Sequence, residues 1–369
     1  MFTSPLCFVI NMAIVYIVYE ICRLVFLAVN WSMFSDSLTW QAFGEMLVGG
    51  WFFDTSAILY TNALYALLML FPIHYKESAL YQKVAKWVFV VVNAVSIVAN
   101  LTDCVYFQYT TRRTTVTVFS EFKNENNLGS IFGVELLRHW YLVLIGVLLI
   151  AALWYFYRMP KGERPEAVKR PYRLKPMARY YAVQTVCLVV FVPFCVAGMR
   201  GGFTTAVRPI TISNANQYVE RPLEAAIVLN TPFSLIRTMG KKVFQVPDYY
   251  TAQQLDAIYS PIHLPSDTLV KRKKNVVVII IESFGREYIG GFNKWLDGGK
   301  YKGYTPFVDS LMQHSATYQY SFCNGRKSID GMPSVLSSIP MFIEPFFLTS
   351  ASMNNVSGLA GELKKEGYY

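Results

Sequence analysis

The stretch that decides the fold of the C-terminal region is Asn275-Val-Val-Val-Ile-Ile-Ile-Glu282-Ser283. Val276–Ile281 is six consecutive β-branched residues, which is typical of a central parallel strand covered on both faces of a sheet. Such a strand delivers the Glu282 carboxylate to its C-terminal end. Ligands of doubly wound sheets bind beyond the carboxyl ends of the strands, so this end of the strand is the first candidate for a functional site.

The residues that follow continue an alternating α/β pattern. Thr305-Pro306 is typical of a helix start, with Thr as N-cap and Pro at the first helical position. Strand, helix, strand, helix in this order predicts a doubly wound sheet. The further elements expected are a helix over Phe307–His314, a strand at about Ala316–Phe322, a helix over Ser328–Leu336 that Pro333 interrupts early, and a helix over Val356–Glu366.

A second polar motif, Asn324-Gly-Arg-Lys-Ser-Ile-Asp330, presents the Ser328 hydroxyl from a tight turn. A serine hydroxyl is a poor nucleophile unless a base or a metal ion activates it. No histidine lies within easy sequence reach, so a metal ion is the expected activator. A divalent cation held by Glu282 and Ser328 would polarise a phosphoryl oxygen, and Arg326 and Lys327 would clamp the substrate phosphate. The pattern favours metal-dependent phosphoryl transfer.

Both motifs also have purely structural explanations. A glutamate at a strand end is most often a helix cap or an ion-pair partner, and a Gly-Arg-Lys-Ser turn is most often only a turn. The residues alone leave both interpretations open.

The N-terminal half is expected to lie in a membrane. The chain is 53% hydrophobic, 16% aromatic and 16% charged, with a mean hydropathy of +0.30, which is too apolar for an ordinary soluble protein. The apolar excess precedes residue 200, and each apolar segment is near the roughly 20 residues that a bilayer requires. The five spans expected are Leu6–Val29, Met46–Phe71, Trp87–Phe107, Trp140–Tyr157 and Tyr181–Met199.

Loop charges predict the orientation of these spans. The first loop, Asn30–Glu45, has no Lys or Arg, whereas the fourth, Arg158–Arg179, has eight basic residues. The positive-inside rule then places the N-terminus inside and everything after Met199 outside. The formal charge of +10 is explained by this topology, and no nucleic-acid partner is expected because the basic cluster sits between two spans.

Three regions are therefore predicted: a five-span transmembrane domain (1–199), an extracytoplasmic linker (200–270) and an extracytoplasmic α/β domain (271–369). Short helices near the membrane surface are expected in the linker at Tyr218–Leu229 and Phe233–Lys242. No cysteine pair has the spacing of a metal site, so the six cysteines are interpreted as small buried residues.

Four charged residues fall within the predicted spans. Glu20 and Arg23 lie three apart, so they share a helix face and are expected to pair. Asp54 and Asp103 have two interpretations, a polar path for a lipid headgroup or structural pairing that fixes the order of the helices. The sequence leaves these two open.

The chain resembles the lipoteichoic acid synthase family, whose extracytoplasmic domain is sulfatase-like and belongs to the alkaline phosphatase superfamily. The similar segments are Asn275–Glu282, Thr305–Leu311 and Asn324–Asp330 in the outer region, with Phe53–Tyr60 and Leu229–Leu235 before it. The resemblance implies a bacterial cytoplasmic membrane protein and covers almost the whole chain.

The family resemblance assigns a role to one residue of each motif. It implies that Glu282 is a ligand of Mn²⁺, with Mg²⁺ or Zn²⁺ as alternatives, and that Ser328 is the nucleophile. Ser328 would take a phosphoglycerol group from phosphatidylglycerol, release diacylglycerol, and pass the group to a glycan or glycolipid acceptor.

Two departures from the family pattern affect this expectation. The usual nucleophile of the family is threonine, where this chain has Ser328. The Asp-His pair that completes the family's metal site is not found before Tyr369, so the sulfatase-like domain is expected to be incomplete and the 369-residue chain to be inactive by itself.

Three alternatives remain from the sequence. A phosphoethanolamine transferase ranks lower because such enzymes carry several outer-domain cysteines, and here Cys323 is alone in that region. A sulfatase-like hydrolase lacks its C/S-x-P-x-R motif. An inactive truncated paralogue with a binding role is the alternative of a different class.

Overall fold

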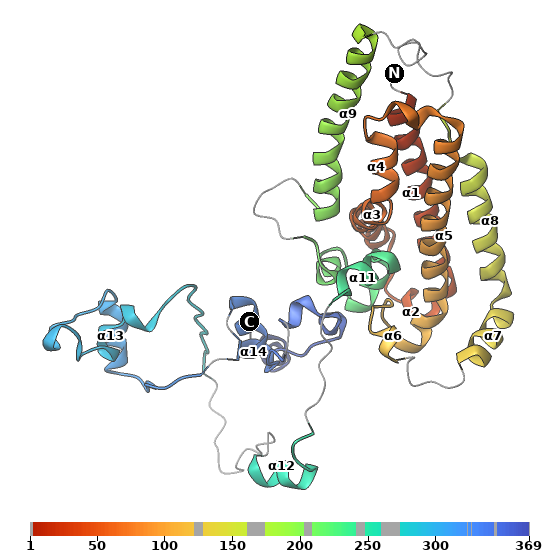
Figure 1. The fold of residues 1–369 in the computed structure, drawn as a ribbon. Coiled ribbons are helices and arrows are strands. Elements are labelled where there is room, and N and C mark those ends of the chain that lie inside the picture. The colour runs from red at the N-terminus through yellow and green to blue at the C-terminus, as the bar shows by residue number, and fades with distance from the viewer. Residues whose placement is uncertain are drawn as a thin grey trace. The chain divides into compact units, whose positions relative to one another are not determined.

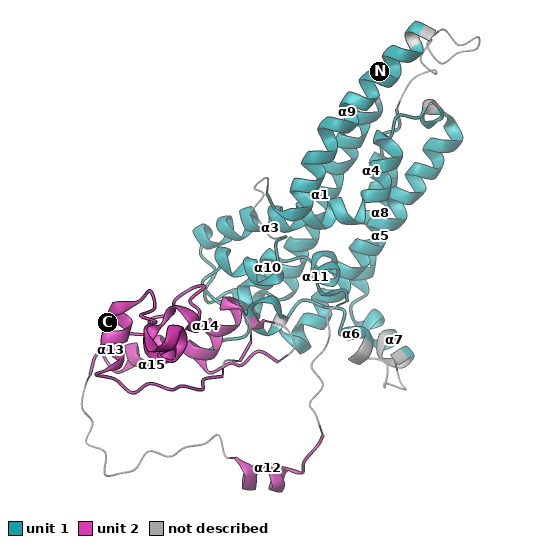
Figure 2. Ribbon diagram, turned by 60° about the vertical axis from the view of Figure 1, so that its left-hand side comes forward, with its two compact units in different colours: residues 1–242, 347–356 teal, residues 243–346, 357–369 magenta. Residues whose placement is uncertain are grey.

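The computed structural model describes residues 3–121, 128–160, 174–202, 209–240, 248–259, 274–322, 324–325, 327–342 and 345–368. The chain divides into two compact units (Figure 2). The first comprises Met1–Lys242 and Phe347–Val356, and the second comprises Val243–Phe346 and Ser357–Tyr369.

The first unit is a bundle of apolar helices (Figure 1). Its long helices are α1 (Thr3–Val29), α3 (Trp40–Thr61), α5 (Ala79–Thr110), α8 (Trp140–Phe156) and α9 (Leu174–Arg200), and the short helix α4 (Ala63–Leu70) follows α3 directly. Its shorter elements are α2 (Trp31–Phe34), η1 (His74–Glu77), α6 (Val118–Glu121), α7 (Leu128–Arg138), η4 (Ile212–Tyr218), η5 (Pro222–Glu224), α10 (Ala225–Val228), α11 (Thr231–Thr238) and η10 (Ser350–Met353).

Several of these helices could cross a membrane. By length and composition α1, α5 and α9 qualify, and α3 with α4 makes a fourth if the bent pair is one span. Helix α8 is apolar but has 17 residues, which is at the short end of what a bilayer requires. The helical nature of the N-terminal half is confirmed. The count of five spans stays a prediction, as does the orientation, because most of the basic fourth loop lies outside the described residues.

The expected span Met46–Phe71 is two helices rather than one. Helices α3 and α4 meet at Asn62 with a bend of 67°, and Figure 1 shows α3 nearly end-on while α1, α5, α8 and α9 run lengthwise. At the bend the amides of Asn62 and Asn93 donate to each other, at 3.1 and 2.8 Å. This reciprocal pair, buried between α5 and the bend, gives the polar groups of both side chains a partner.

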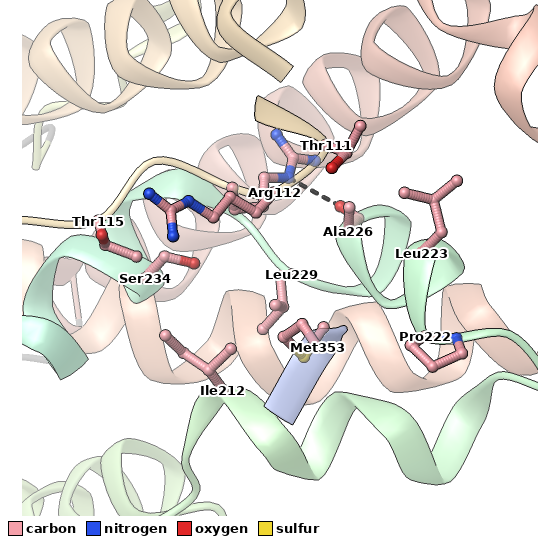
Figure 3. Close-up of a pocket in the computed structure, with 11 residues that line it drawn as sticks. Thr111, Arg112, Thr115, Ile212, Pro222, Leu223, Ala226, Leu229, Ser234 and Met353 are labelled. Carbon is pink, nitrogen blue, oxygen red and sulfur yellow. Dashed lines mark hydrogen bonds between the residues drawn. The ribbon is translucent and has the colours of Figure 1, made fainter. Parts of the chain in front are cut away.

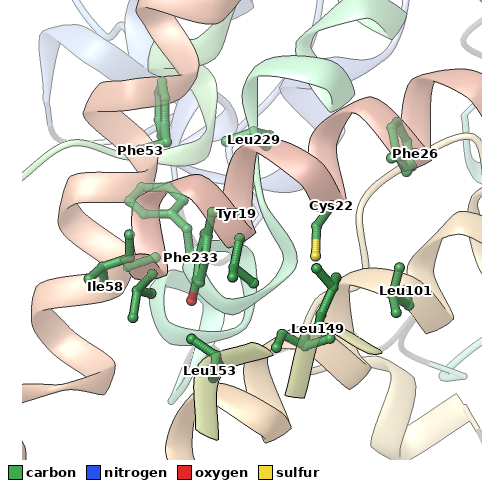
Figure 4. Packing of buried hydrophobic residues seen from close by; sticks show 14 of the residues in the cluster. Tyr19, Cys22, Phe26, Phe53, Ile58, Leu101, Leu149, Leu153, Leu229 and Phe233 are labelled. Carbon is green, nitrogen blue, oxygen red and sulfur yellow. The ribbon is translucent and has the colours of Figure 1, made fainter. Parts of the chain in front are cut away.

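Apolar side chains fill the centre of the bundle around α1 (Figure 4). Phe26 lies edge-on to Phe107 with the ring centroids 4.9 Å apart, and Phe34 stacks on the same ring at 5.8 Å. Between membrane helices such contacts contribute dispersion and shape rather than a hydrophobic driving force, because lipid tails are as apolar as the side chains. Polar contacts therefore carry more of the specificity of the arrangement.

Two adjacent glycines of α3 allow other elements to approach closely. A Cβ atom at Gly49 would lie 2.5 Å from Cγ of Tyr218 in η4, and one at Gly50 would lie 2.4 Å from Cζ of Arg23 in α1. Small residues at helix contacts serve this purpose in membrane bundles. At these two positions a larger side chain would displace a neighbouring element.

The segment predicted as a surface linker is packed into the bundle. Residues 224–234 are all buried, and α10 and α11 contact α1, α3 and α5. Helices occur close to the two places predicted, as η5 with α10 and as α11. Their burial was not foreseen, because the segment is short and only moderately apolar.

A buried ion pair holds one side of this segment. The Arg23 guanidinium in α1 pairs with the Asp54 carboxylate in α3 and donates to the carbonyl oxygens of Ile227 and Val228, the latter at 2.7 Å. The second Asp54 oxygen accepts from the Asn230 amide at 2.8 Å. Arg23 is 3% exposed and Asp54 is fully buried, so each charge is neutralised by the other and by fixed dipoles.

A second ion pair holds the other side. Arg113, which follows α5, pairs with Asp103 at 3.4 Å and donates from Nε to the Ala226 carbonyl at 2.7 Å. Asp103 also accepts from the hydroxyl groups of Thr231 at 2.6 Å and Thr114 at 2.5 Å. The two ion pairs therefore hold the consecutive residues Ala226–Thr231 from two sides. The Arg23–Asp54 pair contacts them from α1 and α3, and the Arg113–Asp103 pair contacts them from α5 and the loop that follows it.

Removal of one partner of the Arg23–Asp54 pair should destabilise the helical unit more than removal of both. Arg23→Met leaves the buried Asp54 without its cation, and Asp54→Leu leaves the buried Arg23 with only the partly exposed Glu20, so each should cost about 3–5 kcal/mol, and the double variant should be less destabilised than either. Chemical unfolding of the four proteins in detergent micelles measures this. Glu20→Gln is the control, because Glu20 pairs with the same arginine but is 37% exposed. Additive costs would contradict the coupling.

Glu224 anchors the chain just before the buried segment Ala226–Thr231. Its carboxylate accepts from the Ser37 hydroxyl and pairs with Arg221 at 2.9 Å, and its side chain is 3% exposed. Burial raises the pKa of Glu224, but the hydrogen bonds from Ser37 and Arg221 outweigh it, so the pKa lies below its ordinary value of 4.5. Between the two values the folded state binds fewer protons than the unfolded state.

The contribution of Glu224 to stability should therefore be complete above pH 4.5 and be lost as the pH falls through the lowered pKa. Unfolding of the wild type and of Glu224→Gln, followed from neutral pH to about pH 3, should show a difference in stability that shrinks with acidification. Glu220→Gln, an exposed carboxylate nearby, should differ little from the wild type throughout. A difference independent of pH would rule out the ionised form as the stabilising one.

The second unit contains short helices and loops. Its elements are α12 (Ala252–Ile258), η6 (Arg286–Tyr288), η7 (Gly290–Phe292), η8 (Leu296–Gly299), α13 (Pro306–Met312), α14 (Ser328–Ser337) and α15 (Leu359–Lys365), and η9 (Phe346–Leu348) follows at its boundary. Three expected helices are confirmed as α13, α14 and α15. Pro333 does not interrupt α14, which continues to Ser337.

The expected strands are not formed in the described part of the second unit. One isolated bridge joins Ile289 and Gly303, while Val276–Ile281 and Ala316–Phe322 have no regular structure. The side chains of Val276–Ile281 are 45–80% exposed. A β-branched run favours a strand, but a strand exists only when neighbouring strands satisfy its backbone groups. The structure of the described residues therefore does not confirm the expected α/β domain.

Candidate functional site

Ser328 is the first residue of α14, and the local sequence explains why a helix begins there. Lys327 is the N-cap, and the Asp330 carboxylate accepts from its backbone N–H at 3.2 Å. An acidic residue in the first turn compensates the helix dipole. The Ser334 hydroxyl donates to the Asp330 carbonyl at 2.9 Å, and Ser338, with φ of 55°, ends the helix. The hydroxyl of Ser328 is thereby presented from the exposed N-terminus of a defined helix.

The turn before Ser328 requires a glycine. Gly325 has φ of +99°, and a Cβ atom there would lie 2.3 Å from the Cβ of Asp330. Only glycine combines this backbone conformation with so close an approach. The packing of Gly325 on Asp330 therefore fixes the turn that precedes the hydroxyl.

The Ser328 hydroxyl donates to the carboxylate of Glu282, which lies 46 residues earlier in the chain. The other oxygen of Glu282 accepts from the Ser283 hydroxyl at 3.2 Å, and Ser283 itself has φ of 52°. Glu282 and Ser328 are both exposed. The structure thus brings together the two residues that the sequence proposed as metal ligand and nucleophile.

The predicted phosphate clamp is described only in part. Lys327 is exposed beside Ser328, while Arg326 lies outside the described residues, as does Cys323. A lysine here supplies a point charge rather than the bidentate fork that an arginine would add.

The donor set fits a hard divalent cation in type but not in number. Glu282 and Ser328 offer oxygen atoms, which Mn²⁺ and Mg²⁺ prefer. Within the described ranges no group of three or more His, Cys, Asp or Glu side chains could hold a metal ion, whereas a catalytic cation commonly takes about three protein ligands. These residues alone do not make a complete metal site.

The charged residues of the spans are structural partners. Glu20 pairs with Arg23 at 3.3 Å as expected. Asp54 pairs with Arg23 and Asp103 pairs with Arg113, and both aspartates also accept hydrogen bonds from the buried segment Ala226–Thr231. The sequence did not single out Arg113, and Asn230 and Thr231 were named only within the family-like segment Leu229–Leu235. Of the two interpretations for Asp54 and Asp103, the contacts support structural pairing.

A cavity beside the buried segment Ala226–Thr231 is too small for a lipid headgroup. It lies between the loop Thr111–Thr115, η4, η5–α10 and Met353 (Figure 3). Its volume of about 20 Å³ is close to the minimum that a single water molecule needs. The cavity therefore does not serve as a headgroup site.

No protein-family model, no curated protein and no solved structure matches this chain.

Replacement of Gly325 should disturb the presentation of Ser328. Gly325→Ala forces an L-residue to a left-handed conformation, which costs about 1–2 kcal/mol, and adds the clash with Asp330. Faster hydrogen–deuterium exchange of the α14 amides is expected. Gly331→Ala is the control, because no atom lies within 4 Å of a Cβ there and alanine is the better helix former by up to about 1 kcal/mol. Equal exchange in both variants would show that the turn does not depend on Gly325.

Proposed function

We propose that this protein is a membrane-anchored transferase that moves a phosphoglycerol group from phosphatidylglycerol to an extracytoplasmic glycan or glycolipid through a covalent ester on Ser328. The observation that carries the proposal is the hydrogen bond between Ser328 and Glu282 across 46 residues of chain. The resemblance of Asn275–Glu282 and Asn324–Asp330 to the lipoteichoic acid synthase family supports the choice of substrate class.

The residues of the site have defined roles in this reaction. The Ser328 oxygen attacks the phosphorus atom of the donor, and the bond between phosphorus and the diacylglycerol oxygen breaks. Glu282 accepts the hydroxyl proton and returns it to the departing diacylglycerol oxygen. In the second half an acceptor hydroxyl attacks the same phosphorus, and Ser328 regains its proton through Glu282.

Lys327 and a divalent cation complete the proposed electrostatics. The exposed ammonium group of Lys327 would attract the donor phosphate. A cation, Mn²⁺ by the family resemblance and Mg²⁺ or Zn²⁺ otherwise, would supply Lewis acidity at the phosphoryl oxygens, with Glu282 and Ser328 as two of its ligands.

The apolar helices support the choice of a lipid donor. A membrane anchor keeps an enzyme at the bilayer in which phosphatidylglycerol resides. The proposed arrangement has five spans, the N-terminus inside, and an outer region of sulfatase-like α/β fold that carries Ser328 on the extracytoplasmic side. A bacterial cytoplasmic membrane is the proposed location.

Loss of the Ser328 hydroxyl should abolish turnover. Protein purified from its own host membranes is incubated with phosphatidylglycerol vesicles and Mn²⁺, and diacylglycerol release and a glycerophosphoryl adduct on Ser328 are followed by mass spectrometry. Ser328→Ala should remove both signals, and Glu282→Gln should slow release by about 10²–10⁴-fold, the usual contribution of a general base. Ser328→Thr is the control, because it keeps a hydroxyl nucleophile.

Parallel arms define the donor and the cation. Phosphatidylethanolamine vesicles should give no adduct on Ser328. Removal of divalent cations with a chelator should reduce the release of diacylglycerol, and added Mn²⁺ should restore it. Release of diacylglycerol by Ser328→Ala at the wild-type rate would refute the proposal. An ethanolamine phosphate adduct on Ser328 would replace the donor with phosphatidylethanolamine.

A further inference from the structure

Arg237 lies where three helices of the first unit meet. From α11 its Nη2 donates to the Met199 carbonyl in the last turn of α9 at 2.9 Å, and the Ser56 hydroxyl of α3 donates to the same carbonyl at 2.8 Å. The guanidinium carbon is 5.1 Å from the ring centroid of Tyr60 and 5.4 Å from that of Phe233. These contacts hold the guanidinium plane in one place.

The charge of Arg237 has no carboxylate partner among the described residues. This distinguishes it from Arg23 and Arg113 in the same unit, each of which pairs with an aspartate. The Nε atom of Arg237 is buried and has no hydrogen-bond partner within the described structure. A guanidinium has five N–H donors, and a buried donor without an acceptor is unfavourable.

The helix dipole accounts for only part of this arrangement. A cation at a helix C-terminus is favourable because the last carbonyl groups carry partial negative charge, and this explains the bond from Nη2 to Met199. It leaves the buried Nε without an acceptor. An additional anionic oxygen is what the site lacks.

We infer that Arg237 binds the phosphate group of an anionic phospholipid. A guanidinium is a strong charge-assisted donor to phosphate oxygens, and the side chain is partly exposed, so a phosphate can reach its exposed part. Lipid is the fitting source because α9 beside it has little protein packing, with 11% of its span buried. Phe194 is 59% exposed and Val196 is 47% exposed, which offers apolar surface to acyl chains.

The site is separate from the chemistry of Ser328, and its occupancy does not require turnover. It would anchor a lipid against the junction of α3, α9 and α11. A bound phosphate would thereby stabilise the same junction that Arg237 joins to the end of α9.

Thermal unfolding in neutral detergent tests the inference with phosphatidic acid, which carries a phosphate but no headgroup to transfer. Phosphatidic acid should raise the melting temperature of the wild type, and phosphatidylcholine should not. Arg237→Gln should bind phosphatidic acid about tenfold more weakly, as expected for one lost charge-assisted bond. Arg138→Gln is the matched control, because Arg138 is an exposed arginine of the same unit and should bind like the wild type.

The outcomes separate the sources of phosphate. A shift with inorganic phosphate equal to that with phosphatidic acid supports the anion site but assigns it to a soluble ligand. An unchanged shift in Arg237→Gln, or an equal shift with phosphatidylcholine, overturns the inference. If Arg237→Gln does not fold, the wild-type protein can be tested instead by crosslinking to a phosphatidic acid with a photoreactive acyl chain. Crosslinks near Phe194 and Val196 support the site, and crosslinks confined to other helices overturn it.

Discussion

The helical unit depends on two buried ion pairs that face each other across one short stretch of chain. Arg23 with Asp54 and Arg113 with Asp103 each combine a guanidinium that binds backbone carbonyl groups with a carboxylate that binds Asn230 or Thr231. The carbonyl groups belong to Ala226, Ile227 and Val228 at the end of α10. A four-residue helix cannot satisfy its own terminal carbonyls, so the arginines supply what the backbone lacks.

This arrangement explains why polar residues persist in so apolar a bundle. Apolar contact alone discriminates weakly between neighbours in a membrane, because lipid offers a similar environment. Buried charges discriminate strongly between possible helix arrangements, because a wrong arrangement leaves each charge without its partner. The Asn62–Asn93 amide pair does the same at the bend between α3 and α4. Each of these polar contacts joins elements that are far apart in the sequence.

The second unit has the opposite character. Its helices are short and exposed, and Val276–Ile281 presents apolar side chains without strand partners in the described residues. Even so, the turn around Gly325 and the first turn of α14 are locally determined, because glycine, aspartate and serine each satisfy a specific backbone requirement there. Local geometry presents the Ser328 hydroxyl, whereas its contact with the Glu282 carboxylate across 46 residues of chain is tertiary, and a complete cation site would require additional ligands.

The sequence by itself determined most of the helices, because apolar length, N-cap residues and Thr-Pro starts act within a few residues of the chain, but it did not reveal the bend between α3 and α4. It also determined that Glu20 and Arg23 pair, since a helix fixes the distance between positions three apart. Only the tertiary structure decided that Asp54 and Asp103 are structural, that residues 224–234 are buried, and that Arg237 has no carboxylate partner among the described residues. Those outcomes depend on which helices pack together, which residue patterns do not encode. The predicted strands remained undecided for the same reason, because a strand is a property of its neighbours rather than of its own side chains.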